Sequence, residues 1–328
     1  MTTLWDVTGT DVVKALAAER RLSGSVSSGL ALTLVVVVDE KRVVEAEAAA
    51  TRAAAQHPCR LLVVVRRRPD APEPRLDAEV LIGGRLGPGE AVVMRMYGRL
   101  ALHAESVVLP LLAPDAPVVT WWFGQPPYEV SHDPLGVIAD RRITDSMAAP
   151  EPLAALRSRA LDYAPGDTDL AWTRTTLWRG LCASAFDSLT GPARSVVVAG
   201  EAHNPSRALL AGWLQSRLGL EIGLEASSGP GVTGVRVELD GCTVDISRSD
   251  GRTATLARTG QPDRAMPLPR RDLGDLLAEE LRRLDSDETY AEALEAATGE
   301  RGLSARSPVR THVWTDPALD RDPAPTAP

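Results

Sequence analysis

Two short valine-rich runs constrain the fold of this chain more than any other feature. Leu32 to Val38 and Arg60 to Val65 are apolar at almost every position, yet far too short to cross a membrane. Such runs are typical of strands buried on both faces of a sheet. An alanine-rich segment over 40–56 lies between them, and Pro58 ends the helix that it predicts. Because strand-helix-strand units cross over with a right hand, the two strands should be parallel.

Weaker patterns fill the rest of the first half. Two alternating runs, over 76–82 and 90–97, are joined by a glycine-rich stretch and predict a hairpin. We further expect a helix over 10–21 with Thr10 as N-cap, a helix over 103–112, a strand over 118–122 and a short strand over 137–139.

The second half has a similar order of elements. A valine-rich strand over 195–199 leads to Asn204 and Pro205, an N-cap followed by proline in the first turn of a helix. Two Asp-Gly pairs, at 240–241 and 250–251, separate three alternating runs and predict an antiparallel meander. Helices are expected over 153–162, 170–186 and 273–284. The predicted buried face of the meander consists of Val235, Val237, Leu239, Val244, Ile246, Ala254 and Leu256.

Both halves are therefore predicted to be mixed α/β lobes, each with a mixed sheet and an antiparallel hairpin or meander packed by helices. We place an N-terminal α/β domain at residues 1–150 and a C-terminal α/β domain with a helical lead-in at 151–299. Five prolines and little apolar periodicity predict a disordered tail over 300–328. Trp314 in this tail is either incidental or a docking anchor.

Composition narrows the classes of partner. With 44 acidic and 36 basic residues the chain carries a net charge of −8, so bulk electrostatic binding of nucleic acid is excluded. Cys59, Cys182 and Cys242 are too few and too scattered for a disulfide scaffold or a CxxC zinc site, which favours reduced thiols in the cytoplasm. Only two of the 36 basic residues are lysines. The arginine excess reflects either codon usage or the needs of protein interfaces.

No motif of catalysis or cofactor binding is complete. Residues 229–234 spell GxGxxG, but a strand and not a helix follows, so a hairpin approach is the better interpretation. The His103-Ala104-Glu105 stretch lacks the PCxxC partner of a deaminase zinc site. We expect no catalytic residue, metal or cofactor. A ligand pocket would best lie beyond the strand over 195–199, lined by Glu201, His203 and Asn204, unless these residues serve only the turn and the cap.

Two tryptophan segments stand out. Trp121 and Trp122 end a predicted strand, where adjacent rings face opposite sides of a sheet edge. At least one ring should be in the core, and the other is a candidate contact with a partner. In the helix over 170–186, Arg174 is placed to stack on Trp178 one turn later. Trp178 and Cys182 also lie on one apolar stripe, so Cys182 should be an inert buried thiol.

Several ordered stretches carry a resemblance to a known family. They are His57 to Arg60, 89–93, 103–112, 114–119 before Trp121, 139–146, and 169–174 through Arg179. With these stretches, residues 1 to about 297 resemble the OpcA family of glucose-6-phosphate dehydrogenase assembly proteins. Cyanobacterial members are associated with redox control. We do not expect redox control in this chain, because its three cysteines are far apart in the sequence and form no CxxC pair.

The resemblance implies a cytoplasmic, non-catalytic assembly factor and allosteric activator of glucose-6-phosphate dehydrogenase, which feeds the oxidative pentose phosphate pathway. Neither nucleic acid nor membrane is an expected partner. The alternative is a sugar-phosphate- or nucleotide-binding enzyme or sensor that uses the loop over 200–204. The candidate partner-interface residues are Trp121, Trp122, Asp140, Arg141, Arg142, Asp145, Ser146, Trp172, Arg174, Trp178 and Arg179.

Overall fold

The two valine-rich runs form the centre of an eight-stranded sheet, sheet A, in the computed structural model of the protein. The structure describes residues 1–23, 30–83, 89–187 and 191–312. Strands β2 (Leu32–Val38) and β3 (Cys59–Arg67) are parallel, with Val36 opposite Val63. A 3-10 turn (Glu40–Arg42) and helix α2 (Val43–Ala54) connect them. The predicted strand-helix-strand unit is confirmed.

Sheet A has the strand order β1-β4-β5-β3-β2-β6-β7-β8. The predicted hairpin is present, since β4 and β5 are antiparallel, and β1 pairs with β4 in the same sense; the other neighbours are parallel. The remaining strands of the sheet are β1 (Thr2–Leu4), β4 (Arg75–Ile82), β5 (Glu90–Tyr97), β6 (Val118–Phe123), β7 (Arg141–Thr144) and β8 (Asp167–Asp169).

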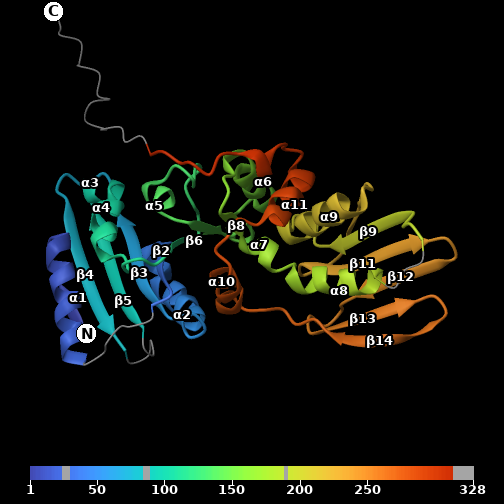
Figure 1. Ribbon diagram of the computed structural model, residues 1–328, viewed down its shortest axis with the longest axis horizontal. Coiled ribbons are helices and arrows are strands. Elements are labelled where there is room, and N and C mark those ends of the chain that lie inside the picture. Colours follow the sequence, from blue (N-terminus) through green and yellow to red (C-terminus); the bar gives the residue numbers. More distant parts are fainter. Residues whose placement is uncertain (24–29, 84–88, 188–190, 313–328) are drawn as a thin grey trace, which may run out of the picture.

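Helices cover both faces of sheet A. Figure 1 shows α1 (Gly9–Ser23) on the outer side and α2 with α10 (Leu273–Arg282) on the side toward the second sheet. The outer layer also contains α3 (Arg99–Leu102), α4 (Ala104–Val108) and a 3-10 turn (Leu109–Leu111). Helix α10 approaches α2 so closely that a Cβ on Gly274 would lie 2.8 Å from the Arg52 side chain. A segment from the second half of the chain thus completes the core of the first.

Sheet B contains the predicted meander and has the order β10-β9-β11-β12-β13-β14. Helices α8 (Thr176–Phe186) and α9 (Pro205–Leu218) cover one face, and all seven predicted inward residues are packed there. Strands β10 and β14 were not predicted. The strands are β9 (Ser195–Gly200), β10 (Gly223–Ala226), β11 (Val232–Leu239), β12 (Cys242–Ser247), β13 (Thr253–Arg258) and β14 (Gln261–Pro267).

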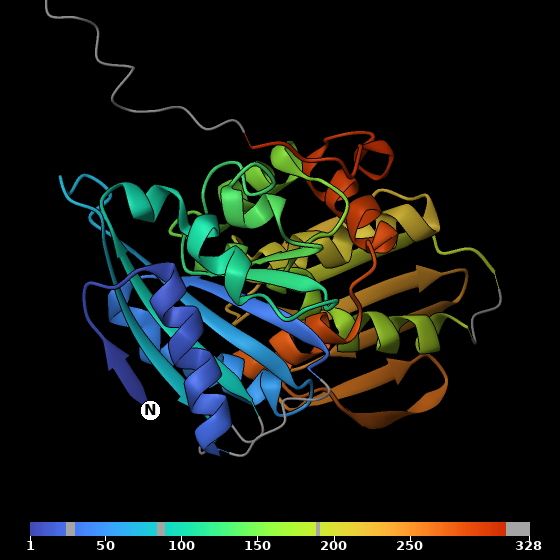
Figure 2. The ribbon, with the colours of Figure 1, turned by 60° about the vertical axis from the view of Figure 1, so that its left-hand side comes forward.

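A helical layer connects the two sheets (Figures 1 and 2). Helices α6 (Pro152–Asp162), α7 (Leu170–Thr173) and α11 (Glu288–Thr298) pack with α9 around Trp172 and Tyr290. Sheet A itself reaches Asp169 in β8, so it continues past the boundary that we placed at residue 150. In the described residues, no helix is both long enough and apolar enough to span a membrane.

Three local predictions are wrong. Helix α1 begins earlier than expected because Thr8, not Thr10, caps it: the backbone N–H groups of Thr8 and Asp11 each donate to the other residue's side chain, at 3.1 and 3.3 Å. The strand expected over 137–139 is instead the last residue of helix α5 (Pro134–Val137), which Asp133 caps, and the turn after it. The helix expected over 170–186 is broken into α7 and α8, where the Thr175 hydroxyl donates to the Trp172 carbonyl at 2.7 Å.

The first residues of the expected disordered tail are packed against the fold. Leu303, in a 3-10 turn (Leu303–Ala305), is fully buried. One guanidinium nitrogen of Arg306 lies 2.9 to 3.0 Å from the carbonyl oxygens of Ala160, Leu161 and Tyr163. The prediction of disorder is therefore wrong for residues 300–312, because arginine donors rather than an apolar stripe hold them. Trp314 lies outside the described residues.

A buried ion pair holds α10 against sheet A. Arg141 of β7 is 3% exposed and donates from Nε to Glu280 of α10, itself 6% exposed, at 3.1 Å. The other carboxylate oxygen of Glu280 accepts from the Thr173 hydroxyl at 2.6 Å, and Arg141 also donates to the Asp285 carbonyl at 2.9 Å. Every group of this pair thus has a partner, which a buried charge requires.

We expect Glu280→Gln to lower the free energy of unfolding by about 3 kcal/mol, because it leaves the Arg141 charge buried without a counter-ion. Glu279→Gln is the matched control on the same helix. Its carboxylate pairs with Arg271 near the surface, so the loss should be about 1 kcal/mol or less. Urea denaturation followed by circular dichroism measures both. Equal losses in the two variants would contradict the role assigned to the buried pair.

Candidate functional site

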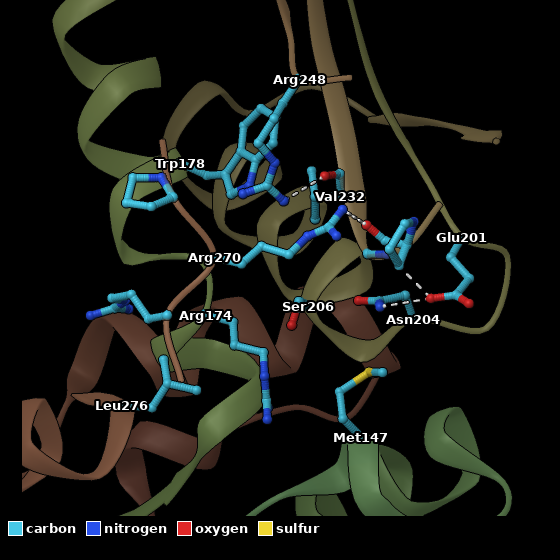
Figure 3. A pocket seen from close by; sticks show the side chains of 14 residues that line it. Met147, Arg174, Trp178, Glu201, Asn204, Ser206, Val232, Arg248, Arg270 and Leu276 are labelled. Carbon is cyan, nitrogen blue, oxygen red and sulfur yellow. Dashed lines mark hydrogen bonds between the residues drawn. The ribbon is translucent and has the colours of Figure 1, made fainter. Parts of the chain in front are cut away.

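A cavity of about 210 Å³ opens at the end of sheet B, where α8 and the start of α10 face it (Figure 3). Loops after β9 and β12, the start of β11 and the segment before α10 form its walls. Of the three residues predicted to line a pocket, Glu201 and Asn204 line this cavity. His203 is exposed and does not. The cavity lies beyond the carboxyl end of a strand, as ligand sites in α/β sheets usually do.

The turn after β9 fixes the positions of Glu201 and Asn204. The side-chain oxygen of Asn204 accepts from the backbone N–H of Arg207 at 3.1 Å, so Asn204 caps α9 as predicted. Its amide nitrogen donates to Oε2 of Glu201 at 3.4 Å, and the Gly231 N–H donates to the same oxygen at 3.3 Å. These contacts hold the Glu201 carboxylate at the cavity wall.

Two arginines of the cavity have no acidic partner. Arg248, 7% exposed, donates to the carbonyls of Leu268 and Val232 at 3.1 and 3.0 Å, and its guanidinium lies 5.0 Å from the Trp178 ring centroid. Arg270 donates to the Pro230 carbonyl at 2.7 Å. In the described part of the chain neither forms a salt bridge. Burial, and next the charge of Arg270, lowers the pKa of Arg248 to about 10.

The other two arginines of the cavity are neutralised. Arg174 donates twice to Asp145, both times at 2.7 Å, and Arg271 pairs with Glu279. The expected stacking of Arg174 on Trp178 is therefore wrong, since the guanidinium of Arg248 lies over that ring instead. The sequence did not point to Arg248 or Arg270 as pocket residues, because Arg248 follows a strand and Arg270 lies among prolines, and neither belongs to a motif. Only the tertiary fold brings them together.

Most of the predicted interface residues are buried. Trp121 and Trp122 are 0 and 1% exposed because β6 lies inside sheet A, between β2 and β7, and not at an edge as expected. Neither ring can therefore contact a partner in this fold. The other predicted interface residues with buried side chains are Arg141, Arg142, Ser146, Trp172 and Trp178.

These polar side chains are used within the fold. Arg142 pairs with Asp167, and the Ser146 hydroxyl donates to Asp169 at 2.7 Å. The indole N–H of Trp172 donates to Asp287 at 2.9 Å. The stretches of sequence that carry the family resemblance thus include residues that build the core.

Some predicted interface residues remain accessible. Asp140 is exposed, Asp145 and Arg174 are half-buried, and Arg179 is half-buried above Trp172 with its guanidinium 3.6 Å from the ring centroid. Arg179 lines a polar groove of about 410 Å³ between α8, α10 and α11, which we call the α8–α11 groove. Burial lowers the pKa of Arg179 to about 10. Arg282, Arg283, Asp285 and Glu288 give the groove exposed charges of both signs.

Family models match most of the chain. Residues 50–161 match the glucose-6-phosphate dehydrogenase subunit N-terminal domain, and residues 165–294 match the C-terminal domain of the same subunit, both of the OpcA type. Together they span about three quarters of the sequence. The chain belongs to the OpcA family. The resemblance seen in the sequence is thereby confirmed, and the OpcA domains include both the cavity and the α8–α11 groove. No curated protein matches the chain significantly.

Solved structures with a likeness to this OpcA-family chain are distant. The 3-ketoreductase KijD10 from Actinomadura kijaniata with TDP-benzene and NADP, in an open conformation, is 12% identical over 86% of this chain and 99% of its own, with a TM-score of 0.42. An oxidoreductase from Sinorhizobium meliloti is 12% identical over 86 and 91%, with a TM-score of 0.36. At these scores the likeness supports no conclusion about function.

The described His, Cys, Asp and Glu side chains form no group of three that could hold a metal ion. The three cysteines are free, with Cys59 and Cys182 buried and Cys242 partly exposed. Burial raises the pKa of both the Cys59 and the Cys182 thiol to about 12. The expected inert, buried character of Cys182 agrees with this environment.

We expect an aromatic disulfide reagent at about pH 8 to modify one thiol of the folded protein rapidly, that of Cys242, because the other two stay protonated and buried. In guanidinium chloride all three should react. Cys242→Ser should abolish the fast phase while leaving two slow thiols. A fast phase that persists in Cys242→Ser would show that Cys59 or Cys182 becomes accessible.

Proposed function

We propose that this protein is a non-catalytic assembly factor and allosteric activator of glucose-6-phosphate dehydrogenase, acting in the cytoplasm on the oxidative pentose phosphate pathway. The observation that carries the proposal is the match of both domains to models described as parts of a glucose-6-phosphate dehydrogenase subunit. Activation needs no chemistry from this chain. Binding the active state of the dehydrogenase more tightly by about 1–3 kcal/mol shifts its population about 5- to 150-fold.

We assign the contact with the dehydrogenase to the α8–α11 groove. It retains Arg179 from the predicted interface segments, with its guanidinium over the buried ring of Trp172. Arg282 and Arg283 are exposed beside acidic residues, an arrangement that favours complementary charged contacts at a protein interface. Helices α8, α10 and α11 form most of the groove, and the short connection from Arg283 to Asp287 completes it.

Titration of the purified protein into the dehydrogenase of the same organism should change the rate of NADP reduction in a saturable way. We expect a change in maximal rate or substrate affinity, with saturation at a fixed molar ratio. Size-exclusion chromatography with light scattering should show both chains in one species. An unchanged rate, an unchanged substrate affinity and separate elution would together refute the proposal.

Arg283→Glu should weaken binding to the dehydrogenase about tenfold, because it reverses a charge at the rim of the groove. The matched control is Arg157→Glu on α6, an exposed arginine outside the groove. It makes the same charge change and should leave unchanged the concentration of this protein that gives half-maximal activation. Activity titrations at two salt concentrations measure both. If the two variants shift the curve equally, only net charge matters and the groove is not the interface.

A further inference from the structure

The cavity at the end of sheet B has a property that the proposed function does not use. We propose that it binds a small phosphorylated sugar or a similar phosphorylated polyol, with the phosphate held by Arg248 and Arg270 and hydroxyl groups held by Glu201 and Asn204. The site and its test concern this chain alone and do not depend on the dehydrogenase.

The charges of the cavity favour an anion. Arg248 is more than nine-tenths buried, and its Nε–H has no hydrogen-bond partner within the described residues. The positive charge of Arg270 lies close enough to repel that of Arg248. Neither guanidinium forms a salt bridge within the described residues, and the charge of Asp250 offsets only part of the cost of burying Arg248. Two such neighbouring charges, one of them desolvated, are unfavourable unless an anion joins them. Figure 3 shows both side chains at the same end of the cavity, above Ser206.

A phosphate group matches this pair better than a carboxylate does. A phosphate monoester carries about −1.5 to −2 charges near pH 7 and has three acceptor oxygens. It can therefore balance the charges of two guanidinium groups, whereas a single carboxylate would balance only one. Arg174 and Arg271 do not compete for the anion, because Asp145 and Glu279 already pair with them.

The opposite wall suits hydroxyl groups. Glu201 uses Oε2 for its contacts with Asn204 and Gly231, which leaves Oε1 without a partner among the described residues. A free carboxylate oxygen accepts from a hydroxyl group but repels a second anion. The ligand that fits therefore has its charge at one end and hydroxyl groups at the other.

Size and wall chemistry limit the ligand further. About 210 Å³ is less than the roughly 300–1,000 Å³ typical of sites for drug-sized ligands, so a dinucleotide does not fit. Trp178, Val232 and Leu276 supply apolar surface against which the CH groups of a sugar ring can pack. A hexose or pentose monophosphate meets all three conditions.

Isothermal titration calorimetry of the full chain tests the site with four probes: glucose 6-phosphate, glucose, inorganic phosphate and AMP. We expect one molecule of glucose 6-phosphate per chain and no measurable heat from glucose. Inorganic phosphate should compete with glucose 6-phosphate but bind at least about tenfold more weakly. Absence of binding, tighter binding of AMP, or binding of glucose alone would each overturn the proposal.

Variants connect the binding to the cavity. Arg270→Gln should weaken glucose 6-phosphate about tenfold or more, while Arg264→Gln, an exposed arginine on β14, should leave it unchanged. Glu201→Gln should weaken glucose 6-phosphate but not inorganic phosphate, since only the sugar uses that wall. The side chains of Arg270 and Glu201 are exposed, so these variants should stay folded even where Arg248→Gln does not. Equal affinities in Arg270→Gln and Arg264→Gln would refute the site.

Discussion

The buried pair of Arg141 and Glu280 is the contact on which the arrangement of both lobes depends. It joins strand β7, which lies next to the edge strand β8 of sheet A, to a helix that follows sheet B in the chain. Helix α10 then supplies Leu276 and Leu277 to the core of sheet A and begins just after Arg270 and Arg271 at the cavity. Because the pair is buried and fully hydrogen-bonded, its geometry is fixed, and with it the position of the cavity wall.

One helix therefore contributes to two surfaces. Leu276 of α10 faces the cavity at the end of sheet B, while Glu279 and Arg282 of the same helix line the α8–α11 groove. An element that contacts two sites couples them when the two ligands favour different positions of that element. The geometry thus allows a small anion in the cavity and a protein in the groove to influence each other through α10.

The sequence predicted the elements that have a strong local signal. β2 and β3 are dense in β-branched residues, the meander is marked by Asp-Gly turns, and Asn204 with Pro205 marks the start of α9. The short strands β7, β8 and β10 carry three or four residues each, too few for a period. The error about Trp121 and Trp122 has another cause: the order of strands in the sheet decides whether β6 lies at an edge, and local sequence does not encode that order.

The arginine excess now has a structural use that composition did not reveal. Buried and half-buried arginines satisfy backbone carbonyls at places where the chain leaves regular structure: Arg142 donates to Ala139, Arg207 to Ala202, and Arg306 to Ala160. Arg60 and Arg142 have an acid as well, Glu90 and Asp167, as a buried cation requires. Arg248, like Arg207, has carbonyl partners and no salt bridge among the described residues, but it also has the charged Arg270 beside it. This second charge singles out the cavity, because a structural role accounts for the carbonyl contacts of Arg248 but not for another guanidinium beside it that also lacks a salt bridge among the described residues.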